Sequence, residues 1–171
     1  INGKAALFSK NNVVVYENGK KTSFKSKNIV IATGSYPTSL PGIKIDEKNV
    51  VSSTGALSLE SVPSNLVVIG GGYIGLEMGS VWSRLGSKVT VVEYLDHIIP
   101  GMDREVSKEF QKILTKQGIN FKLECKVVSV KNTKDKVSVE LVNNKSNKKE
   151  IIDTNKVLVS VGRKPYTEGL N

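Results

Sequence analysis

One short stretch of the sequence constrains the fold more than any other. An apolar run, residues 66–69, leads into residues 70–75, which read GGGYIG and fit the pattern G-x-G-x-x-G. In this pattern Gly70 permits a tight turn from a strand into a helix, Gly72 leaves room for a pyrophosphate close to the backbone, and Gly75 lets the helix pack against the strand. The stretch therefore predicts a strand, a turn and a helix whose N-terminus receives the phosphates of a dinucleotide.

The residues after the turn support this interpretation. G-x-G-x-x-G alone is weak evidence, because glycine-rich turns also occur without a ligand. Here an apolar stripe at helical spacing follows, formed by Ile74, Met78, Val81, Trp82 and Leu85. Gly86 comes next, where a glycine commonly ends a helix. The context of strand, turn and helix therefore favours dinucleotide binding.

An acidic residue indicates which dinucleotide is bound. A second apolar run, residues 89–92, ends in Glu93, about 20 residues beyond the motif, where the ribose-binding acid is expected. A carboxylate accepts hydrogen bonds from ribose hydroxyls and repels a 2′-phosphate, so Glu93 predicts NAD(H) rather than NADP(H). The alternative is that Glu93 is a solvated residue at the end of a strand.

Charge and composition argue against several other functions. The 171 residues carry a net charge of +9, with 25 Lys and Arg against 16 Asp and Glu. Basic residues gather near two expected turns: Lys131, Lys134, Lys136, Lys145, Lys148 and Lys149. They are not interleaved with aromatic residues, so we expect a solvated surface rather than nucleic-acid binding, with an acidic partner as the alternative. No apolar run is long enough to span a membrane, so we expect no membrane partner.

The single cysteine and the single histidine suggest neither a disulfide nor a metal site. Cys125 cannot form an intramolecular disulfide, and we expect a small buried thiol. His97 follows the second strand, and we expect it at the surface and not in catalysis. The low cysteine content fits a reducing compartment, which favours the cytoplasm, with the mitochondrial matrix as the alternative.

The first third of the chain predicts strands and a connector. Residues 1–31 indicate short strands with a hairpin turn at Asn18-Gly19, and residues 28–32 predict a compact apolar strand. Residues 36–65 contain several prolines and predict a connector with one helical turn at residues 53–57.

The rest of the chain predicts an α/β fold. Residues 66–118 alternate strand, helix, strand, helix, and the second helix, Asp103–Gln117, carries apolar residues at helical spacing: Val106, Phe110, Ile113 and Leu114. Strand signals return at residues 120–130, 136–142 and 151–161. We therefore expect a Rossmann-like, doubly wound parallel sheet with an antiparallel β-meander and a short β-rich flank.

Four segments make the chain similar to a known family. They are residues 29–35 (IVIATGS), 52–57 (SSTGAL), 67–86, and 161–165 (VGRKP). In their order and spacing the chain resembles the middle third of the two-dinucleotide-binding disulfide reductases. The SSTGAL segment together with GSVWSRLG at residues 79–86 resembles the branch of that family that oxidises dihydrolipoyl groups.

The resemblance implies a domain organisation and a function for the parent protein. Residues 1–36 would be the C-terminal part of an FAD-binding domain, residues 37–162 an NAD-binding domain, and residues 163–171 the return to the FAD domain. The parent would be a homodimer that passes electrons from dihydrolipoyl groups through a redox disulfide and FAD to NAD+. Its partner would be the dihydrolipoyl domain of a 2-oxoacid dehydrogenase or glycine-cleavage complex. The alternatives are another FAD-dependent disulfide reductase, an NADH oxidase, or a stand-alone dinucleotide-binding module.

The resemblance also assigns roles to single residues. NAD would contact Gly70, Gly71, Gly72, Tyr73, Ile74, Gly75, Leu76, Glu77, Glu93, Val127 and Gly162. FAD, held only by the full-length parent, would contact Ala5, Thr33, Gly34 and Ser35, although the family usually has glycine at the position of Ala5. Tyr73 and Glu77 would lie close to the flavin, with a packing role as the alternative for Tyr73. The redox C-x-x-x-x-C pair and the His-Glu acid/base pair of the family have no counterpart in this sequence, so we expect no catalytic residue in this piece.

Overall fold

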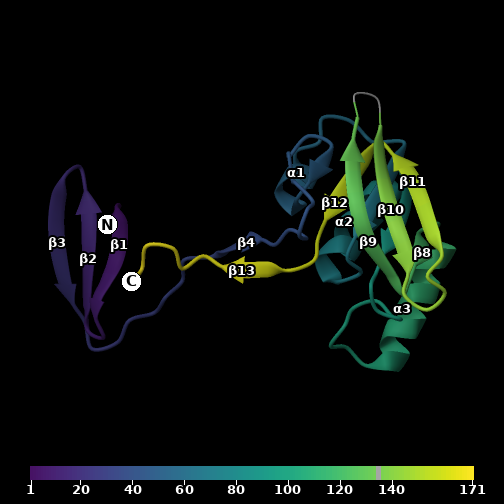
Figure 1. Ribbon diagram of the computed structural model, residues 1–171. Helices are drawn as coiled ribbons and strands as arrows, with labels where there is room; N and C mark the ends of the chain where they lie inside the picture. Colours follow the sequence, from purple (N-terminus) through teal and green to yellow (C-terminus); the bar gives the residue numbers. More distant parts are fainter. Residues whose placement is uncertain (134–135) are drawn as a thin grey trace. The chain divides into compact units, whose positions relative to one another are not determined.

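The computed structural model describes residues 1–133 and 136–171 (Figure 1). Its contacts divide the chain into two compact units, one formed by Pro37–Gly162 and the other by Ile1–Tyr36 with Arg163–Asn171. Lys134, one of the clustered lysines, lies outside the described residues. Within the described ranges, no helix is long and apolar enough to cross a membrane.

A five-stranded parallel sheet forms the centre of the larger unit. Its strands, in spatial order, are β5 (Val50–Val51), β12 (Lys156–Val159), β6 (Asn65–Ile69), β7 (Lys88–Val92) and β8 (Asn120–Lys122). From β6 the chain adds β7 and β8 on one side, and later β12 on the other. The order of the strands therefore reverses beside β6, and ligands of such sheets bind at the carboxyl ends of the strands at this point.

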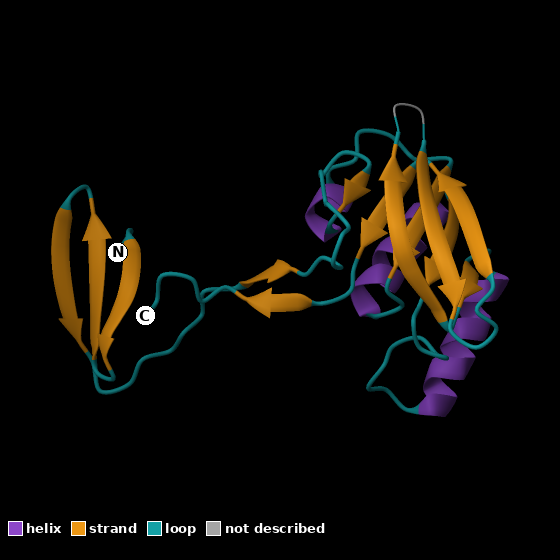
Figure 2. Ribbon diagram, in the orientation of Figure 1, coloured by secondary structure: helices purple, strands orange, loops and turns teal. Residues whose placement is uncertain are grey.

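The sheet is covered differently on its two faces (Figure 2). Leu66 and Val68 of β6 belong to a core with the helices, whereas Val67 and Ile69 belong to a second core with the antiparallel strands. The antiparallel sheet consists of β9 (Cys125–Asn132), β10 (Val137–Asn143) and β11 (Lys149–Thr154). The expected parallel sheet with a β-meander is thus confirmed.

Helix α2 (Tyr73–Arg84) packs on β6 and β7 through small residues. Its buried residues are Gly75, Leu76, Gly79 and Trp82. The apolar stripe at helical spacing is therefore only partly buried: Trp82 lies in the core, whereas Val81 and Leu85 are 49% and 56% exposed. The buried glycines, Gly75 and Gly79, lie on the side of the helix that faces the sheet, together with Leu76 and Trp82.

Helix α3 (Arg104–Lys116) begins where expected, with the Asp103 carboxylate accepting hydrogen bonds from the N–H groups of Glu105 and Val106. The apolar residues at helical spacing in this helix are only partly buried. Leu114 is buried, but Val106 and Ile113 are 49% and 47% exposed. Ser107 is buried instead, because its hydroxyl donates to the carbonyl of Ile98 at 2.8 Å.

Two expected strands are interrupted in the structure. The segment 120–130 divides into β8, which joins the parallel sheet, and β9, which begins the antiparallel sheet. Glu124 lies between them with φ +55°, which redirects the chain. Residues 151–161 divide in the same way between β11 and β12. In the connector, α1 (Ser53–Leu57) confirms the expected helical turn, and the two-residue strand β5 was not predicted.

The smaller unit holds a three-stranded antiparallel sheet: β1 (Lys4–Ser9), β2 (Asn12–Glu17) and β3 (Lys20–Lys25). A separate pair joins β4 (Ser35–Pro37) with β13 (Arg163–Pro165). The strand expected at residues 28–32 is absent from the described structure: this segment has no regular secondary structure, with Val30 87% and Ile31 54% exposed. An apolar sequence forms a strand only beside a partner strand, and none among the described residues pairs with it.

Candidate functional site

The glycine-rich turn follows the carboxyl end of β6. Gly70 has φ +109°, and a Cβ atom there would lie 2.5 Å from the carbonyl oxygen of Ser160. A Cβ atom on Gly75 would lie 2.2 Å from the carbonyl oxygen of Gly70. At Gly72 no atom lies within 4 Å of such a Cβ. The turn is therefore closed toward the protein at Gly70 and Gly75 and open at Gly72, where a ligand can approach the backbone.

The N-terminus of α2 offers free hydrogen-bond donors above this opening. The N–H of Leu76 donates to the carbonyl of Gly72 at 3.0 Å, and no side chain caps the helix at Gly72. The N–H groups of Tyr73, Ile74 and Gly75 precede this bond, so they remain available to an anion together with the positive end of the helix dipole. These residues fit a pyrophosphate group.

Glu93 follows β7 and lies against the turn. Its side chain is buried, with 9% of the residue exposed. One carboxylate oxygen, Oε2, accepts a hydrogen bond from the N–H of Gly71 at 2.6 Å, and Oε1 accepts one from the N–H of Leu95 at 2.9 Å. The structure thus brings the predicted acid to the predicted turn, and the alternative of a solvated residue at a strand end does not hold.

Ser160 completes the turn from the opposite side, and the sequence reasoning missed it. It follows β12, which pairs with β6, and its hydroxyl donates to the carbonyls of Ile69 at 3.0 Å and Gly70 at 3.3 Å. Only the strand order places β12 beside β6, so the sequence alone gives no signal for this contact.

The remaining predicted NAD residues have mixed environments. Val127 lies on β9 opposite Leu141 and packs against the second core. Gly162 has φ +126°, and its carbonyl accepts a hydrogen bond from the N–H of Thr38 at 2.9 Å. The Leu76 side chain is 2% exposed and belongs to the core, so only its backbone lies at the turn.

Tyr73 and Glu77 project from the exposed side of α2. Tyr73 is 69% exposed, and Glu77 is also exposed. They stand at positions i and i+4, so they share one face of the helix. The alternative of Tyr73 as a packing aromatic therefore has no support within the described residues.

The predicted FAD residues lie in the smaller unit, where Arg163 and Tyr166 hold them. The Thr33 hydroxyl donates to the carbonyl of Tyr166, and the N–H of Tyr166 donates to the carbonyl of Gly34 at 2.9 Å. Arg163 donates from Nε to the Ser35 hydroxyl at 2.7 Å and from a terminal nitrogen to the Ser35 carbonyl at 2.6 Å.

The fourth predicted FAD residue, Ala5, has a different setting. It is an exposed residue of β1, where it pairs with Val15 of β2. Residues 33–35 are therefore tied to Arg163 and Tyr166 in the smaller unit, and Ala5 belongs to its separate sheet.

The loop after Glu93 contains the only histidine. His97 Nδ1 lies 2.7 Å from Asp96 Oδ1, and Arg104 contacts both Asp96 oxygens at 3.0 Å. These hydrogen bonds, first that with His97 and then those with Arg104, hold the pKa of Asp96 below its usual range. The side chain of His97 is partly buried, with 19% of it exposed, and its contact with Asp96 lies at the exposed side of the loop.

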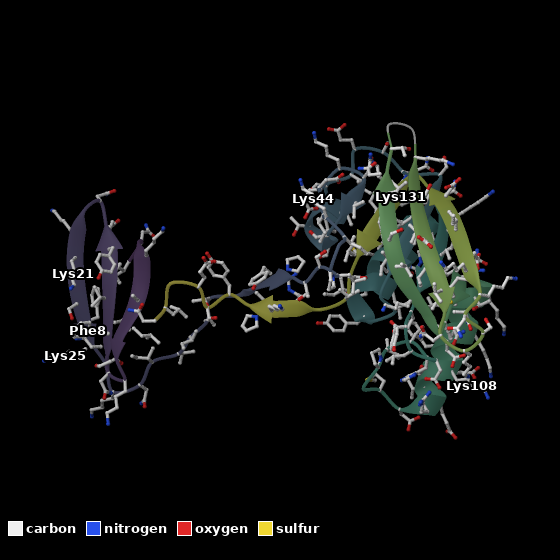
Figure 3. The ribbon with its side chains drawn as sticks, in the orientation of Figure 1. Phe8, Lys21, Lys25, Lys44, Lys108 and Lys131 are labelled. Atoms are coloured by element: carbon white, nitrogen blue, oxygen red, sulfur yellow. The ribbon has the colours of Figure 1, made fainter. Side chains whose placement is uncertain are left out.

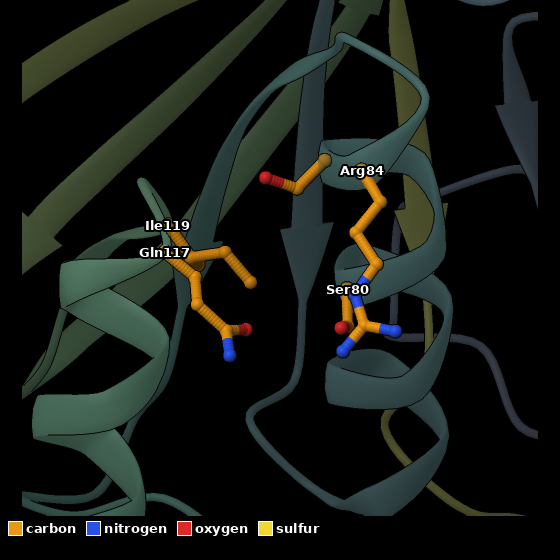
Figure 4. Close-up of a pocket in the computed structure, with 5 residues that line it drawn as sticks. Ser80, Arg84, Gln117 and Ile119 are labelled. Carbon is orange, nitrogen blue, oxygen red and sulfur yellow. The ribbon is translucent and has the colours of Figure 1, made fainter.

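Two surface features lie apart from the turn. A cavity of about 310 Å³ opens between α2 and the end of α3, lined by Ser80, Ser83, Arg84, Gln117 and Ile119 (Figure 4). The clustered lysines that the structure describes are exposed, among them Lys131 (Figure 3). Three of them pair with acids: Lys136 with Asp153, Lys145 with Glu124, and Lys149 with Glu140. The lysines thus form a solvated surface.

Comparison with known proteins agrees with this geometry. A family model described as pyridine nucleotide-disulphide oxidoreductase matches residues 1–171. A dihydrolipoamide dehydrogenase of Chaetomium thermophilum is 58% identical over 92% of this chain and 31% of its own length. The mitochondrial dihydrolipoyl dehydrogenase of Pisum sativum is 56% identical over 90% of this chain and 30% of its own length. The chain thus spans about a third of these relatives.

A solved structure with the same fold is the HOCl-induced flavoprotein disulfide reductase RclA from Escherichia coli. It superposes with a TM-score of 0.80 at 29% sequence identity, over all of this chain and 38% of that protein.

Proposed function

The chain belongs to the pyridine nucleotide-disulphide oxidoreductase family, and on that premise we propose that it is the NAD-binding domain of a dihydrolipoyl dehydrogenase. The sequence identity of 58% and 56% with two dihydrolipoyl dehydrogenases favours this enzyme over another disulfide reductase or an NADH oxidase. The parent oxidises dihydrolipoyl groups of a 2-oxoacid dehydrogenase or glycine-cleavage complex, as a homodimer, in the cytoplasm or the mitochondrial matrix.

One observation carries the assignment to NAD. The buried carboxylate of Glu93 lies against the glycine-rich turn, at the carboxyl end of β7 beside β6. A nucleotide with its pyrophosphate over α2 would place its adenosine ribose near this carboxylate. The carboxylate accepts hydrogen bonds from ribose hydroxyls and repels a 2′-phosphate, so the site selects NAD(H).

The residues around the turn bind and orient the nucleotide. The N–H groups of Tyr73, Ile74 and Gly75 bind the pyrophosphate, and Glu93 binds the ribose. When bound, the nicotinamide of NAD+ would serve as the hydride acceptor, and the reduced FAD of the parent would be the donor. In the parent, Tyr73 and Glu77, on the exposed face of α2, would lie close to the flavin, as the family resemblance implies. Thr33, Gly34 and Ser35 contact FAD in the parent.

Calorimetric titration tests the proposal. The 171-residue chain is titrated separately with NAD+, NADH and NADP+ under the same conditions. We expect NAD+ and NADH to bind at least about tenfold more tightly than NADP+, because the 2′-phosphate meets the carboxylate of Glu93. Equal or tighter binding of NADP+ contradicts the assignment to NAD, and no binding of any of the three contradicts the whole proposal.

A further inference from the structure

We propose that Glu93 is a positioning residue for the glycine-rich turn in addition to its part in ribose binding. The ribose contact rests on the proposed function, but the positioning role is independent of any ligand. It predicts that Glu93 couples the ribose end of the site to its pyrophosphate end, so that replacing Glu93 weakens ligands even when they lack the hydroxyls it recognises.

The Glu93 backbone is fixed by its strand neighbours. Its N–H donates to the carbonyl of Lys122 at 2.9 Å, and its carbonyl accepts a hydrogen bond from the N–H of Cys125, also at 2.9 Å. The residue before it, Val92, accepts a hydrogen bond from the N–H of Gly70 at 2.9 Å. The side chain therefore extends from a rigid point, between the ends of β7 and β8 and the start of β9.

Gly71 is held from two directions. Its N–H donates to Glu93 Oε2 at 2.6 Å, and its carbonyl accepts a hydrogen bond from the N–H of Ile99 at 2.8 Å. The second carboxylate oxygen of Glu93 accepts a hydrogen bond from the N–H of Leu95. Leu95 belongs to the same loop as Ile99. The carboxylate thus ties the turn to the loop that follows β7, and this loop in turn holds Gly71.

This arrangement assigns different tasks to neighbouring N–H groups. The N–H of Gly71 is directed inward to Glu93, whereas the N–H groups of Tyr73, Ile74 and Gly75 remain free for the pyrophosphate. A carboxylate oxygen has two lone-pair sites, so each oxygen of Glu93 can keep its backbone partner and still accept a ribose hydroxyl. Ribose binding therefore adds to the turn contacts and does not replace them.

A glutamine cannot reproduce both backbone contacts. The side chain of glutamine has one acceptor oxygen and one NH2 donor. In the Glu93→Gln variant one of the N–H groups of Gly71 and Leu95 loses its acceptor and faces another donor. The contact with Gly71 is buried and the contact with Leu95 is partly buried. An unpaired group at either place costs free energy, so even this isosteric change loosens the turn or the loop that holds it.

The first experiment tests the positioning role without a ligand. Amide hydrogen exchange is measured by NMR in the unmodified chain, in Glu93→Gln, and in Glu60→Gln, which changes an exposed acid of the connector. We expect the Gly71 or Leu95 amide to exchange at least about tenfold faster in Glu93→Gln alone, while the amides of β6 and β12 are unchanged. Unchanged exchange at both Gly71 and Leu95 overturns the proposal, and so does equal acceleration across β6 and β12, which indicates general destabilisation.

The second experiment tests the coupling. The Kd of NAD+ and of its analogue whose adenosine ribose lacks both the 2′- and the 3′-hydroxyl is measured for the unmodified chain and for Glu93→Gln. We expect the variant to bind the analogue about tenfold more weakly than the unmodified chain does. Equal affinity of both proteins for the analogue overturns the coupling, since Glu93 would then act through the hydroxyls alone. If the unmodified chain binds neither compound, the proposed function fails, and the exchange experiment still decides the positioning role.

Discussion

A methyl group on Gly75 would lie 2.2 Å from the carbonyl oxygen of Gly70, far inside van der Waals contact. The same group would lie 2.6 Å from the hydroxyl oxygen of Ser160 and 3.0 Å from a methyl carbon of Val68. The start of α2 therefore approaches the end of β6 more closely than any residue with a side chain allows. One turn later, at Gly79, the nearest atoms to such a methyl group belong to Val89 and Val68, at 3.4 and 3.7 Å.

These two glycines give a matched pair of variants. We expect Gly75→Ala to lower the free energy of unfolding by about 1–3 kcal/mol, because the methyl group forces the turn apart. We expect Gly79→Ala to be neutral or to stabilise by up to about 1 kcal/mol, since alanine favours a helix and the space is sufficient. Urea denaturation measures both values. A loss at Gly79→Ala as large as that at Gly75→Ala would contradict the assignment of the close contact to Gly75.

Gly72 allows the fold to be separated from ligand binding. It is the N-cap residue of α2 with φ −77° and ψ 176°, a conformation that serine adopts readily, and open space surrounds its Cα. We expect Gly72→Ser to leave the melting temperature unchanged or slightly higher, since serine is a good N-cap. The added side chain occupies the space above the helix N-terminus, so NAD+ should bind at least about tenfold more weakly. Undiminished NAD+ affinity in calorimetry would place the pyrophosphate elsewhere.

The sequence predicted the parts of this site that depend on local pattern. The turn at residues 70–75 and the acid at Glu93 follow from short-range signals of glycine, charge and spacing. The contacts of Ser160 do not, because they depend on β12 pairing beside β6, which no local pattern specifies. The inward direction of the Gly71 N–H was likewise not predictable, because it depends on where the β7 end lies relative to the turn.

The errors in helix faces have a common physical origin. An apolar stripe predicts a buried face when side-chain size decides the packing. In α2 two glycines, Gly75 and Gly79, occupy part of the buried face, and Val81 is exposed. In α3 the hydrogen bond from Ser107 to Ile98 draws that serine into the core, and Val106 remains exposed. The spacing of apolar residues alone therefore does not predict which face of these two helices is buried.

The chain by itself should lack flavin chemistry. Of the residues expected to contact FAD, the chain supplies Ala5 and the segment 33–35, and it has no redox C-x-x-x-x-C pair. We expect the purified chain to show no flavin absorption band and no dihydrolipoamide dehydrogenase activity, even with added FAD. A yellow preparation that reduces NAD+ with dihydrolipoamide would contradict this prediction.

Asp46 organises the loop before β5 in the larger unit. Its Oδ1 accepts hydrogen bonds from the N–H groups of Lys48, Asn49 and Val50, at 2.8, 2.9 and 2.9 Å. Its Oδ2 accepts a hydrogen bond from the Asn132 amide at 2.7 Å. Burial raises the pKa of Asp46, but these hydrogen bonds together outweigh it and leave the pKa below its ordinary value.

Asp46 should therefore contribute stability that depends on pH. A carboxyl whose pKa is lower in the folded than in the unfolded chain stabilises the fold above its unfolded pKa of about 4, and this contribution is lost as pH falls through the folded pKa. In Asp46→Asn the charge is lost and an amide donor faces the amide of Asn132. We expect this variant to be about 1–2 kcal/mol less stable than the unmodified chain at pH 7. The difference in stability should narrow as the pH falls below the unfolded pKa of about 4 and through the lower folded pKa. Urea denaturation across this range measures it, with Glu60→Gln as the control for loss of an exposed charge. A difference in stability that stays constant with pH would contradict this prediction, because the negative charge of Asp46 would then not contribute to stability.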